Sequence, residues 1–240
     1  MLPSQALSTI SNQANTKKSF ASKIFDRKIN LSFLIIIVVL YLIATANIGF
    51  FTQVLSVYPL STNIGFIVSL SGLLFSLMWL IVQLLCYRPI AKPVLIALVL
   101  IAAVCGYFTD AYGTIFDTNM LINSLQTDQA EAMELMSLSF FIRLLILGVV
   151  PAVIISKLKI KPTSLRRSIL QKTATLIAAI ALVGVCLLPF GDQYATFFRQ
   201  HKMVRSYTNP ITPIYSVIKL GTDYICLLYT SDAADDLLCV

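Results

Sequence analysis

Three polar side chains at helical spacing form the first candidate site of this chain. Asn123, Thr127 and Glu131 recur at positions i, i+4 and i+8, so a helix that continues from Thr118 onward places them within about 80° of one another. A carboxylate there can take an ammonium group, while an amide and a hydroxyl donate hydrogen bonds to phosphate oxygens. The spacing therefore predicts a polar ridge, defined by these three residues, that binds a zwitterionic lipid headgroup.

A helix-capping role explains part of the same pattern. Thr127 or Asp128 followed by Glu131 resembles a helix start, in which Asp128 is the cap and Glu131, three residues later, is its reciprocal partner. A capping role does not exclude a ligand role for the same residues. Asn123 distinguishes the two explanations, because it lies a full turn before Thr127 and takes no part in a capping box.

The ridge belongs to a polar stretch that hydrophobic sequence surrounds. Tyr107–Leu135 contains five acids, whereas the apolar runs on either side contain none; these acids are Asp110, Asp117, Asp128, Glu131 and Glu134. Of the 240 residues, 58% are hydrophobic and 12% are charged, whereas about 25% of residues are charged in soluble domains. The composition therefore predicts a polytopic membrane protein in which this stretch is exposed to water.

Five apolar runs approach or reach the ~20 residues that a helix needs to cross the hydrocarbon core. They are Leu31–Thr52, Ile64–Cys86, Pro93–Phe108, Phe140–Ser156 and Thr173–Phe190. Pairs of small residues four apart predict close contact between helices; these pairs are Gly65/Ser69, Gly72/Ser76, Ala102/Gly106 and Gly148/Ala152. The fold class predicted is an all-α membrane protein with five transmembrane helices, a periplasmic polar helical loop and a juxtamembrane interfacial helix.

The first run also admits a second interpretation, as a secretory signal peptide. Ala44-Thr45-Ala46 follows a short apolar core in the small-x-small pattern of cleavage sites. The leader before it is long and polar, and apolar sequence continues through Phe50 and Phe51 beyond the supposed cut. These two features favour a transmembrane helix.

The distribution of basic residues predicts the orientation in the membrane. Basic loops lie at Arg88–Lys92 and Lys157–Lys172, and the tail of residues 1–30 is also basic, so all three are expected to be cytoplasmic. The acidic loop, residues 109–139, is expected on the periplasmic side, and five spans within residues 31–190 bring the C-terminal part to that side as well. Because the cations lie between spans and not on one soluble face, the net charge of +7 does not indicate nucleic-acid binding.

Residues 191–223 are expected to form an interfacial helix and a linker. Phe197 and Phe198 can enter the acyl boundary while three cations reach lipid phosphates, namely Arg199, Lys202 and Arg205. A plain anchor without lipid specificity is the alternative. Pro210 and Pro213 disfavour helix for the residues that precede them, so an extended linker is predicted there.

Metal-binding patterns are missing from the sequence. It contains no CxxC and no Cys/His spacing typical of zinc sites, and its one histidine, His201, cannot supply three or four ligands. Cys86, Cys105 and Cys186 lie in or at the ends of apolar runs, where a thiol acts as a small hydrophobic group. No metal or other cofactor is therefore predicted for this chain.

Several segments in the same order resemble one enzyme family. They are ATANIGFF at Ala44–Phe51, KPVLI at Lys92–Ile96, YFTDAYGTIFDTNML and NSLQTDQAEA in the polar stretch, and FFRQHKMVRSYTNPITPIYSVIKL before the tail. From about Asn30 to Leu220 the chain resembles the lipid A phosphoethanolamine transferases, which include the mobile colistin-resistance enzymes.

The resemblance implies an activity and a place in the cell. Such enzymes have a five-helix domain in the inner membrane of Gram-negative bacteria and a periplasmic zinc domain, where a threonine takes phosphoethanolamine from phosphatidylethanolamine and passes it to lipid A. The modification confers polymyxin resistance. Matching the lipid-binding positions of the family implies that Asn123, Thr127 and Glu131 hold the donor headgroup.

The resemblance stops before the end of the sequence. Residues 224–240 contain neither the polar linker nor the strand that the family implies next, so they are interpreted as an unrelated tail on a truncated chain, or else as a short natural tail. The nucleophile and the zinc ligands are not found in this sequence, so the chain alone is expected to anchor and bind donor lipid without catalysis.

Two other functional classes remain as alternatives. A small transporter or channel usually carries ionisable residues within its spans, and the centres of these spans carry none. A non-catalytic membrane scaffold would keep the helices without needing polar residues in register on the outer loop.

Overall fold

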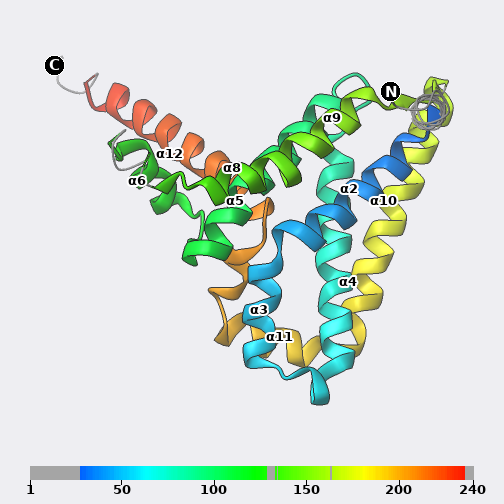
Figure 1. Cartoon of the computed structure of the whole chain (residues 1–240), viewed down its shortest axis with the longest axis horizontal. Coiled ribbons are helices and arrows are strands. Elements are labelled where there is room, and N and C mark those ends of the chain that lie inside the picture. The colour runs from blue at the N-terminus through cyan, green and yellow to red at the C-terminus, as the bar shows by residue number, and fades with distance from the viewer. Residues whose placement is uncertain (1–27, 129–132, 134, 163, 236–240) are drawn as a thin grey trace, which may run out of the picture.

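The computed structural model in Figure 1 describes residues 28–128, 133, 135–162 and 164–235, and side chains within this part except those of residues 165 and 225–235. Apart from one pair of two-residue strands, the elements in this part are helical. The principal helices are α2 (Leu31–Ala46), α3 (Ile48–Val57), α4 (Leu60–Leu85), α5 (Ala91–Tyr112), α6 (Thr118–Gln126), α8 (Leu138–Arg143), α9 (Val150–Lys157), α10 (Leu165–Leu187), α11 (Gly191–Gln200) and α12 (Ile211–Asp235). The all-helical membrane fold predicted from the sequence is confirmed.

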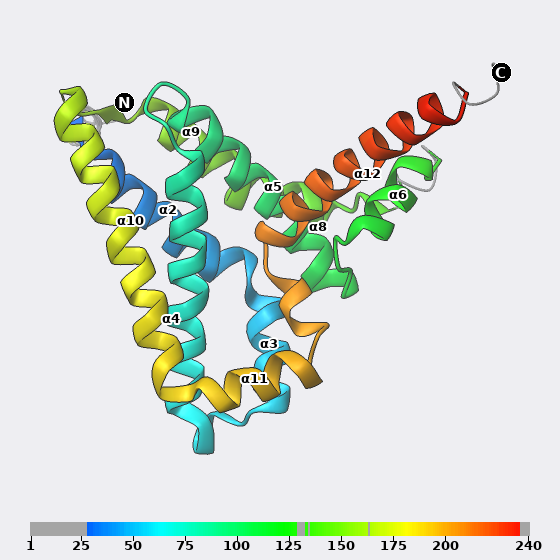
Figure 2. The same cartoon turned by 180° about the vertical axis from the view of Figure 1, so that it is seen from behind.

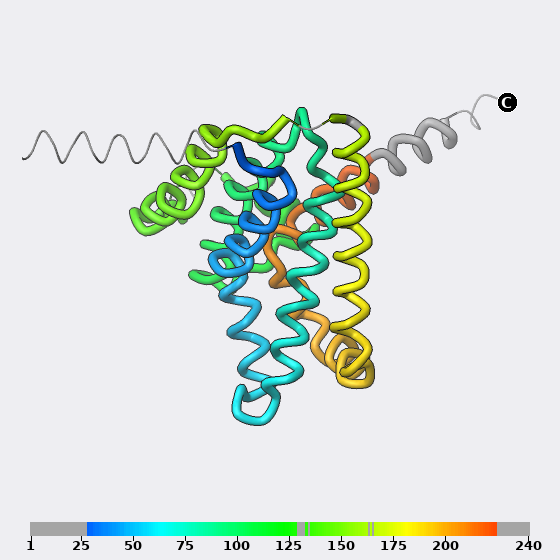
Figure 3. Tube along the Cα trace, turned by 90° about the vertical axis from the view of Figure 1, so that its right-hand side faces the viewer, coloured from blue at the N-terminus to red at the C-terminus, as the bar shows by residue number. Residues whose placement is uncertain are grey.

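The core lies where α2 packs against α4 and α5. Ile35, Val39 and Leu42 are fully buried and follow the i, i+4, i+7 pattern of one helix face. On its other side α4 lies along α10, and the two helices run side by side in all three views (Figures 1, 2 and 3). In contrast, the most hydrophobic windows of the spans Arg166–Gln200 and Leu138–Lys157 are only 11% and 22% buried within the protein, so most of the apolar side chains in these windows are available to lipid.

Four helices are long and apolar enough to cross a membrane, and the bent pair of α2 and α3 brings the number to five among the residues described. The run Leu31–Thr52 was expected to be one helix, but it breaks at Asn47 and the two helices meet at 61°. The Nδ2 group of Asn47 donates to Leu42 O (3.1 Å), and such a local side-chain bond competes with the helical pattern. The bend is therefore encoded by an asparagine inside an otherwise apolar run.

Two boundaries around α3 and α5 differ from the prediction. The predicted spans Leu31–Thr52 and Ile64–Cys86 leave residues 53–63 outside the membrane helices, yet this segment is helical apart from Tyr58 and Pro59, with a kink at Asn63. Proline before the first turn is compatible with this helix start, because the amides of that turn have no intrahelical partner. Helix α5 continues beyond the predicted Pro93–Phe108 and ends at Gly113, whose φ of 66° provides the left-handed cap.

The fourth span changes its helical geometry in the middle. Between α8 and α9 lies η1 (Leu144–Val149), a π-helical segment in which the amide of Val150 donates to Leu145 O, five residues earlier. Together the three elements form the continuous apolar span Leu138–Lys157.

Close helix contacts occur at the predicted small residues. A Cβ atom added at Gly106 would lie 3.2 Å from the Cα atom of Ala46, and one at Gly72 would lie 2.9 Å from Cys186 Sγ. These positions let α5 approach α2, and α4 approach α10, more closely than larger residues permit. Cys86, Cys105 and Cys186 are free and buried, as expected for thiols that act as hydrophobic groups.

The helix predicted after the fifth span is present as α11, but its aromatic side chains pack differently from the prediction. The turn η2 (Leu188–Phe190) leads into α11, which crosses the ends of α3 and α4 (Figure 1). Phe197 on α11 is fully buried, and its ring lies 5.8 Å from that of Phe66 and 5.9 Å from that of Tyr58. The prediction that Phe197 enters lipid is therefore wrong, because protein aromatic rings enclose it, and Phe198 is partly buried against the same core.

The extended linker predicted at the prolines is also wrong. The turn η3 (Val204–Tyr207) is followed by α12, which begins at Ile211. Pro210 precedes this helix and Pro213 lies in its first turn, where a proline removes no intrahelical hydrogen bond. The expectation that a residue before proline is not helical holds for Asn209, which precedes α12. It fails for Thr212, which lies inside the first turn of that helix.

Candidate functional site

Helix α6 carries the first half of the predicted ridge. Asp117 caps the helix and accepts a hydrogen bond from Met120 N (2.8 Å), so α6 begins at Thr118, as expected. It does not continue to position 131, because Thr127 has φ −69° and ψ 133° and the helix ends at Gln126. The three ridge positions are therefore not carried by one continuous helix, since the chain leaves helical geometry at Thr127. Glu131, together with the capping box that it would complete, lies outside the described residues.

Asn123 and Thr127 remain available on this helix. Asn123 is exposed, and its side chain makes no hydrogen bond to any residue that the structure describes. Thr127 is partly buried and its hydroxyl donates to Asn123 O (2.8 Å), which closes the last turn. Asn119, Asn123 and Thr127 follow one another at intervals of four residues, so the first two share a face of α6 and the third follows at its end.

A groove lies between the start of α6 and the segment formed by η3 and α12. Its volume is about 540 Å³. One wall contains Asp117, Thr118 and Asn119 of the α6 start. The opposite wall contains two cations and several hydroxyl groups, namely Arg205, Ser206, Thr208, Thr212, Tyr215, Ser216 and Lys219. The groove thus brings the polar stretch and the segment after the fifth span, about 90 residues apart in sequence, to one place, as α6 and α12 show in Figure 2.

The three predicted interfacial cations do not form one group. Arg199, Lys202 and Arg205 are all exposed, but only Arg205 lines the groove. Lys219 joins it there and was missed by the sequence analysis, although it lies in the quoted segment YSVIKL. Neither Arg205 nor Lys219 forms a salt bridge with a described residue. Both are therefore available to an anionic ligand.

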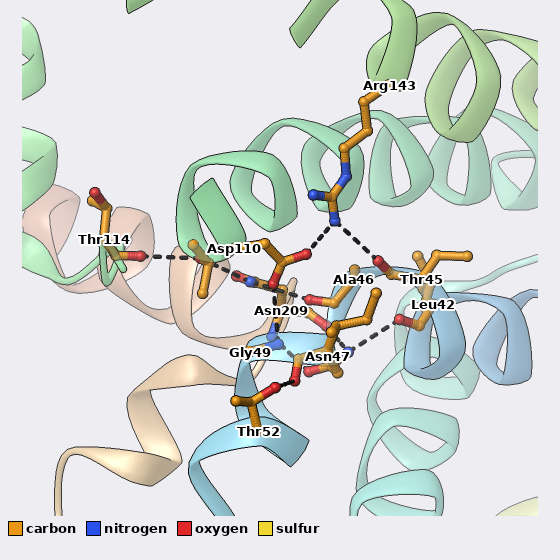
Figure 4. Close-up of polar contacts among 12 residues, drawn as sticks. Leu42, Thr45, Ala46, Asn47, Gly49, Thr52, Asp110, Thr114, Arg143 and Asn209 are labelled. Carbon is orange, nitrogen blue, oxygen red and sulfur yellow. Dashed lines mark hydrogen bonds and ion pairs between the residues drawn. The ribbon is translucent and has the colours of Figure 1, made fainter. Parts of the chain in front are cut away.

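Two buried asparagines hold the second wall of the groove in position (Figure 4). Asn209 N donates to Asn47 Oδ1 (3.0 Å), and Asn47 Nδ2 donates back to Asn209 O (2.7 Å). Asn209 Nδ2 donates to Thr109 Oγ1 (3.1 Å) and to Ala46 O (3.3 Å). The chain between η3 and α12 is thereby attached to the bend between α2 and α3 and to the end of α5.

An ion pair extends the same network toward α8. Asp110, which was expected in the outer loop, lies in the last turn of α5, where it pairs with Arg143 and accepts from Gly49 N (3.0 Å). Arg143 also donates to Thr45 O (3.5 Å). The side chains of Asp110 and Arg143 are 15% and 22% exposed. The sequence analysis did not predict this network. Two polar residues in apolar runs could have indicated it, namely Asn47 within ATANIGFF and Arg143 near the start of the fourth run.

Metal binding receives no support from this part of the protein. Across residues 28–128, 133, 135–162 and 164–235 there is no group of three or more histidine, cysteine, aspartate or glutamate side chains placed to hold a metal ion. A zinc ion does not fit the described residues, so no metal-dependent step is assigned to them.

The chain is similar to known proteins over most of its length. Residues 74–224 match the family model described as phosphoethanolamine transferase EptA/EptB. The phosphatidylethanolamine transferase Mcr-2 of Escherichia coli is 49% identical over 186 residues, which are 78% of this chain and 35% of that protein. Mcr-1 of the same organism is 42% identical over 199 residues, 82% of this chain and 37% of that protein.

A solved structure shares the fold. The integral membrane protein lipooligosaccharide phosphoethanolamine transferase A (EptA) from Neisseria meningitidis superposes with a TM-score of 0.78 at 23% identity, over 82% of this chain and 37% of that one. The chain thus spans a little over a third of the length of the relatives that it matches. The resemblance stated from the motifs is confirmed, and the chain belongs to the EptA/EptB family of phosphoethanolamine transferases.

Proposed function

We propose that this chain is the membrane-embedded part of an enzyme that moves phosphoethanolamine from phosphatidylethanolamine to lipid A, and that its own contribution is to hold the donor lipid. Added phosphoethanolamine brings an ammonium group to lipid A and reduces its negative charge, which is the basis of polymyxin resistance. The setting proposed is the inner membrane of a Gram-negative bacterium, with the N-terminus in the cytoplasm and the groove on the periplasmic side.

The observation that carries this proposal is the groove between α6 and α12. It combines the cations Arg205 and Lys219 with hydroxyl groups on one wall, and the acid Asp117 lies on the other. A phosphate diester with a primary ammonium needs both signs of charge within a few ångströms. Asn119 lines the groove, and Asn123 lies one turn further along the same helix face. The groove therefore begins one helical turn from Asn123, the first of the residues predicted for the headgroup.

In the arrangement proposed, the headgroup lies along the exposed face of α6. Asn123 and Thr127 contact phosphate oxygens, and Glu131 takes the ammonium group. Arg205 and Lys219 attract the phosphate from the opposite wall. The chain binds and orients the donor, and the transfer itself is assigned to residues beyond those described here.

Donor binding can be measured with the chain itself in detergent micelles. Phosphatidylethanolamine should bind more tightly than phosphatidylcholine, whose three N-methyl groups block ammonium hydrogen bonds while the phosphate is unchanged. Asn123→Ala should weaken phosphatidylethanolamine binding several-fold to about a hundredfold, because one hydrogen bond to a charged group contributes about 0.5–3 kcal/mol.

Ser124→Ala is the matched control. Its hydroxyl donates to Met120 O (2.7 Å) within α6, and it lies roughly 140° around the helix from Asn119. Equal affinity of the Asn123→Ala and Ser124→Ala proteins for phosphatidylethanolamine would refute the ligand role of Asn123. Equal binding of both lipids by the unmodified chain would instead favour a scaffold without a donor site.

The ion pair between Asp110 and Arg143 does not favour a transporter over a donor-lipid site. Ionisable residues inside a membrane domain often mark ion paths. Here Asp110 and Arg143 pair with each other, and their remaining bonds go to the backbone at Gly49 and Thr45. The pair therefore connects α5, α8 and the α2–α3 bend instead of lining a path.

A further inference from the structure

Two adjoining cavities lie where the start of α2, the end of α4 and the start of α10 meet, near the N label in Figures 1 and 2. The larger measures about 340 Å³ and is lined by Lys28, Lys161 and Arg167, with Ser164 and Gln171 between them. The smaller measures about 60 Å³, shares Lys161 and Gln171, and adds Arg88 and Lys172. Among the described residues no acid lines either cavity.

The fold brings these cations together from segments far apart in sequence. The strands β1 (Lys28–Ile29) and β2 (Lys159–Ile160) pair in parallel, and Lys161 N donates to Ile29 O (2.9 Å). From the α4–α5 connection, Arg88 donates to Lys161 O (2.9 Å). Cations between spans are needed for orientation in the membrane, but orientation alone does not require them to converge on one cavity.

The start of α10 adds uncharged donors to the larger cavity. Ser164 occupies the N-cap position of this 23-residue helix, and its side chain makes no capping hydrogen bond. The first amides of a helix lack intrahelical partners, and its N-terminus carries a partial positive charge. Ser164 and Arg167 both line the cavity. Cations, a free cap and a helix N-terminus together form an environment suited to a phosphate group.

The smaller cavity contains a buried acceptor without a partner. Gln83 is 4% exposed, and its Oε1 atom has no hydrogen-bond partner among the residues that the structure describes. Its Nε2 group donates to Thr175 Oγ1 (2.7 Å), while the hydroxyl of Thr175 donates to Gln171 O or Lys172 O (both 2.9 Å), which fixes the orientation of the amide. A ligand with a hydroxyl group beside its phosphate would supply the missing donor.

The apolar surroundings indicate that the phosphate belongs to a lipid. Ile169, 58% exposed, lines the smaller cavity, and Leu170 beside it is 70% exposed. The cavity also lies at the ends of α2 and α4, which is the depth of the headgroups if these helices cross the bilayer. Acyl chains can therefore follow α10 while the headgroup enters the cavity.

We propose that the two adjoining cavities form one site that binds the phosphate of an anionic phospholipid headgroup, at the opposite end of the spans from the proposed donor groove. Basic pockets between transmembrane helices recognise anionic lipids in this way. The site is separate from the proposed donor site and does not depend on it.

The test uses the chain in detergent, with native mass spectrometry and phosphatidylglycerol, phosphatidylcholine and free glycerol phosphate as probes. Phosphatidylglycerol should bind at least tenfold more tightly than phosphatidylcholine. The variant Lys28→Gln/Arg167→Gln should lose about tenfold in phosphatidylglycerol affinity. Arg166→Gln, an exposed neighbour outside both cavities, should change it less than twofold.

A second variant separates ligand binding from folding. Ser164→Asp caps a helix about as well as serine and adds a negative charge at the N-terminus of α10, so it should not lower the unfolding temperature. Its carboxylate repels phosphate and should weaken phosphatidylglycerol binding at least tenfold. Unchanged binding by Ser164→Asp, or equal losses in the double variant and in Arg166→Gln, would overturn the proposal. Equally tight binding of phosphatidylcholine would do the same, and tight binding of free glycerol phosphate would show a site for a soluble anion instead of a lipid.

Discussion

Asn47 and Asn209 lie 162 positions apart in the sequence and exchange hydrogen bonds in both directions. The side-chain amide of Asn47 acts as a backbone would in a strand pair, because it donates to the carbonyl and accepts from the amide of the same residue. Both residues are buried, at 0% and 2% exposure. The start of α12, and with it one wall of the groove between α6 and α12, is therefore fixed to the bend of the first span.

Asn47→Ala is expected to destabilise the protein strongly. The substitution removes the partners of Asn209 N and Asn209 O inside the core, and an unsatisfied buried polar group costs about 1–3 kcal/mol. We expect a loss of about 3 kcal/mol in the free energy of unfolding, measured by denaturant titration in detergent. Asn63→Ala is the control, since the bonds of that side chain to described residues go to Pro59 and Thr62 in its own turn. Losses of similar size in the two variants would contradict the role assigned to Asn47.

The Asp110–Arg143 pair predicts a non-additive result. Arg143→Met leaves a largely buried carboxylate with Gly49 N as its described partner, and breaking a buried pair costs about 3–5 kcal/mol. Partial exposure should bring the loss toward the lower end of that range. The double variant Asp110→Leu/Arg143→Met should recover much of it, because no unpaired charge remains. A double-mutant cycle of unfolding free energies tests this, and simple additivity would show that the pair is not coupled.

Cys86 is expected to resist alkylation. It lies just after α4 and is 2% exposed, and burial raises the pKa of its thiol from 9.0 to about 11, although Lys172 opposes the shift. Because the thiolate is the reactive form, only about one molecule in a thousand is reactive at pH 8. A protein with Cys86 as its one cysteine should react with iodoacetamide far more slowly than one with Ile90→Cys in a cysteine-free background. Comparable rates at pH 8 would show that the thiol is accessible.

The orientation remains a prediction that labelling can test. In a background without native cysteines, Ser124→Cys on α6 should react with an impermeant thiol reagent in intact cells. Ser164→Cys at the start of α10 should react only after the membrane is opened. The reverse pattern would place the groove in the cytoplasm and remove the basis for donor binding from the periplasmic leaflet.

The spans could be predicted because their signal is local. A run of apolar residues between basic loops identifies a membrane helix without knowledge of its neighbours, and the family motifs confirmed the fold. The ends of these helices were less predictable. Helix α5 continues to Tyr112 because Asp110 is neutralised by Arg143 from another helix, and an acid in the sequence does not show that such a partner exists.

The candidate site was predicted only in part for the same reason. Spacing selected Asn123 and Thr127; α6 bears Asn123, and Thr127 directly follows its last residue. The opposite wall depends on how α12 returns to α6, and that return depends on contacts such as Asn209 with Asn47, which no local pattern encodes. Phe197 was wrongly expected to contact lipid. An aromatic residue between cations gives the same sequence pattern whether it lies at a lipid interface or in a buried aromatic cluster.

The π-helical segment η1 lets the span Leu138–Lys157 differ by one residue in length between homologues. Arg143 and Gly148 are five residues apart, and both face α5, where Arg143 meets Asp110 and Gly148 lies close to Ala103. In a regular α-helix residues five apart diverge by roughly 140°, whereas residues four apart share a face. The segment therefore accommodates one inserted residue. Homologues that lack one position between the arginine and the glycine would keep both contacts with a regular helix, so a single-residue gap is expected here in alignments.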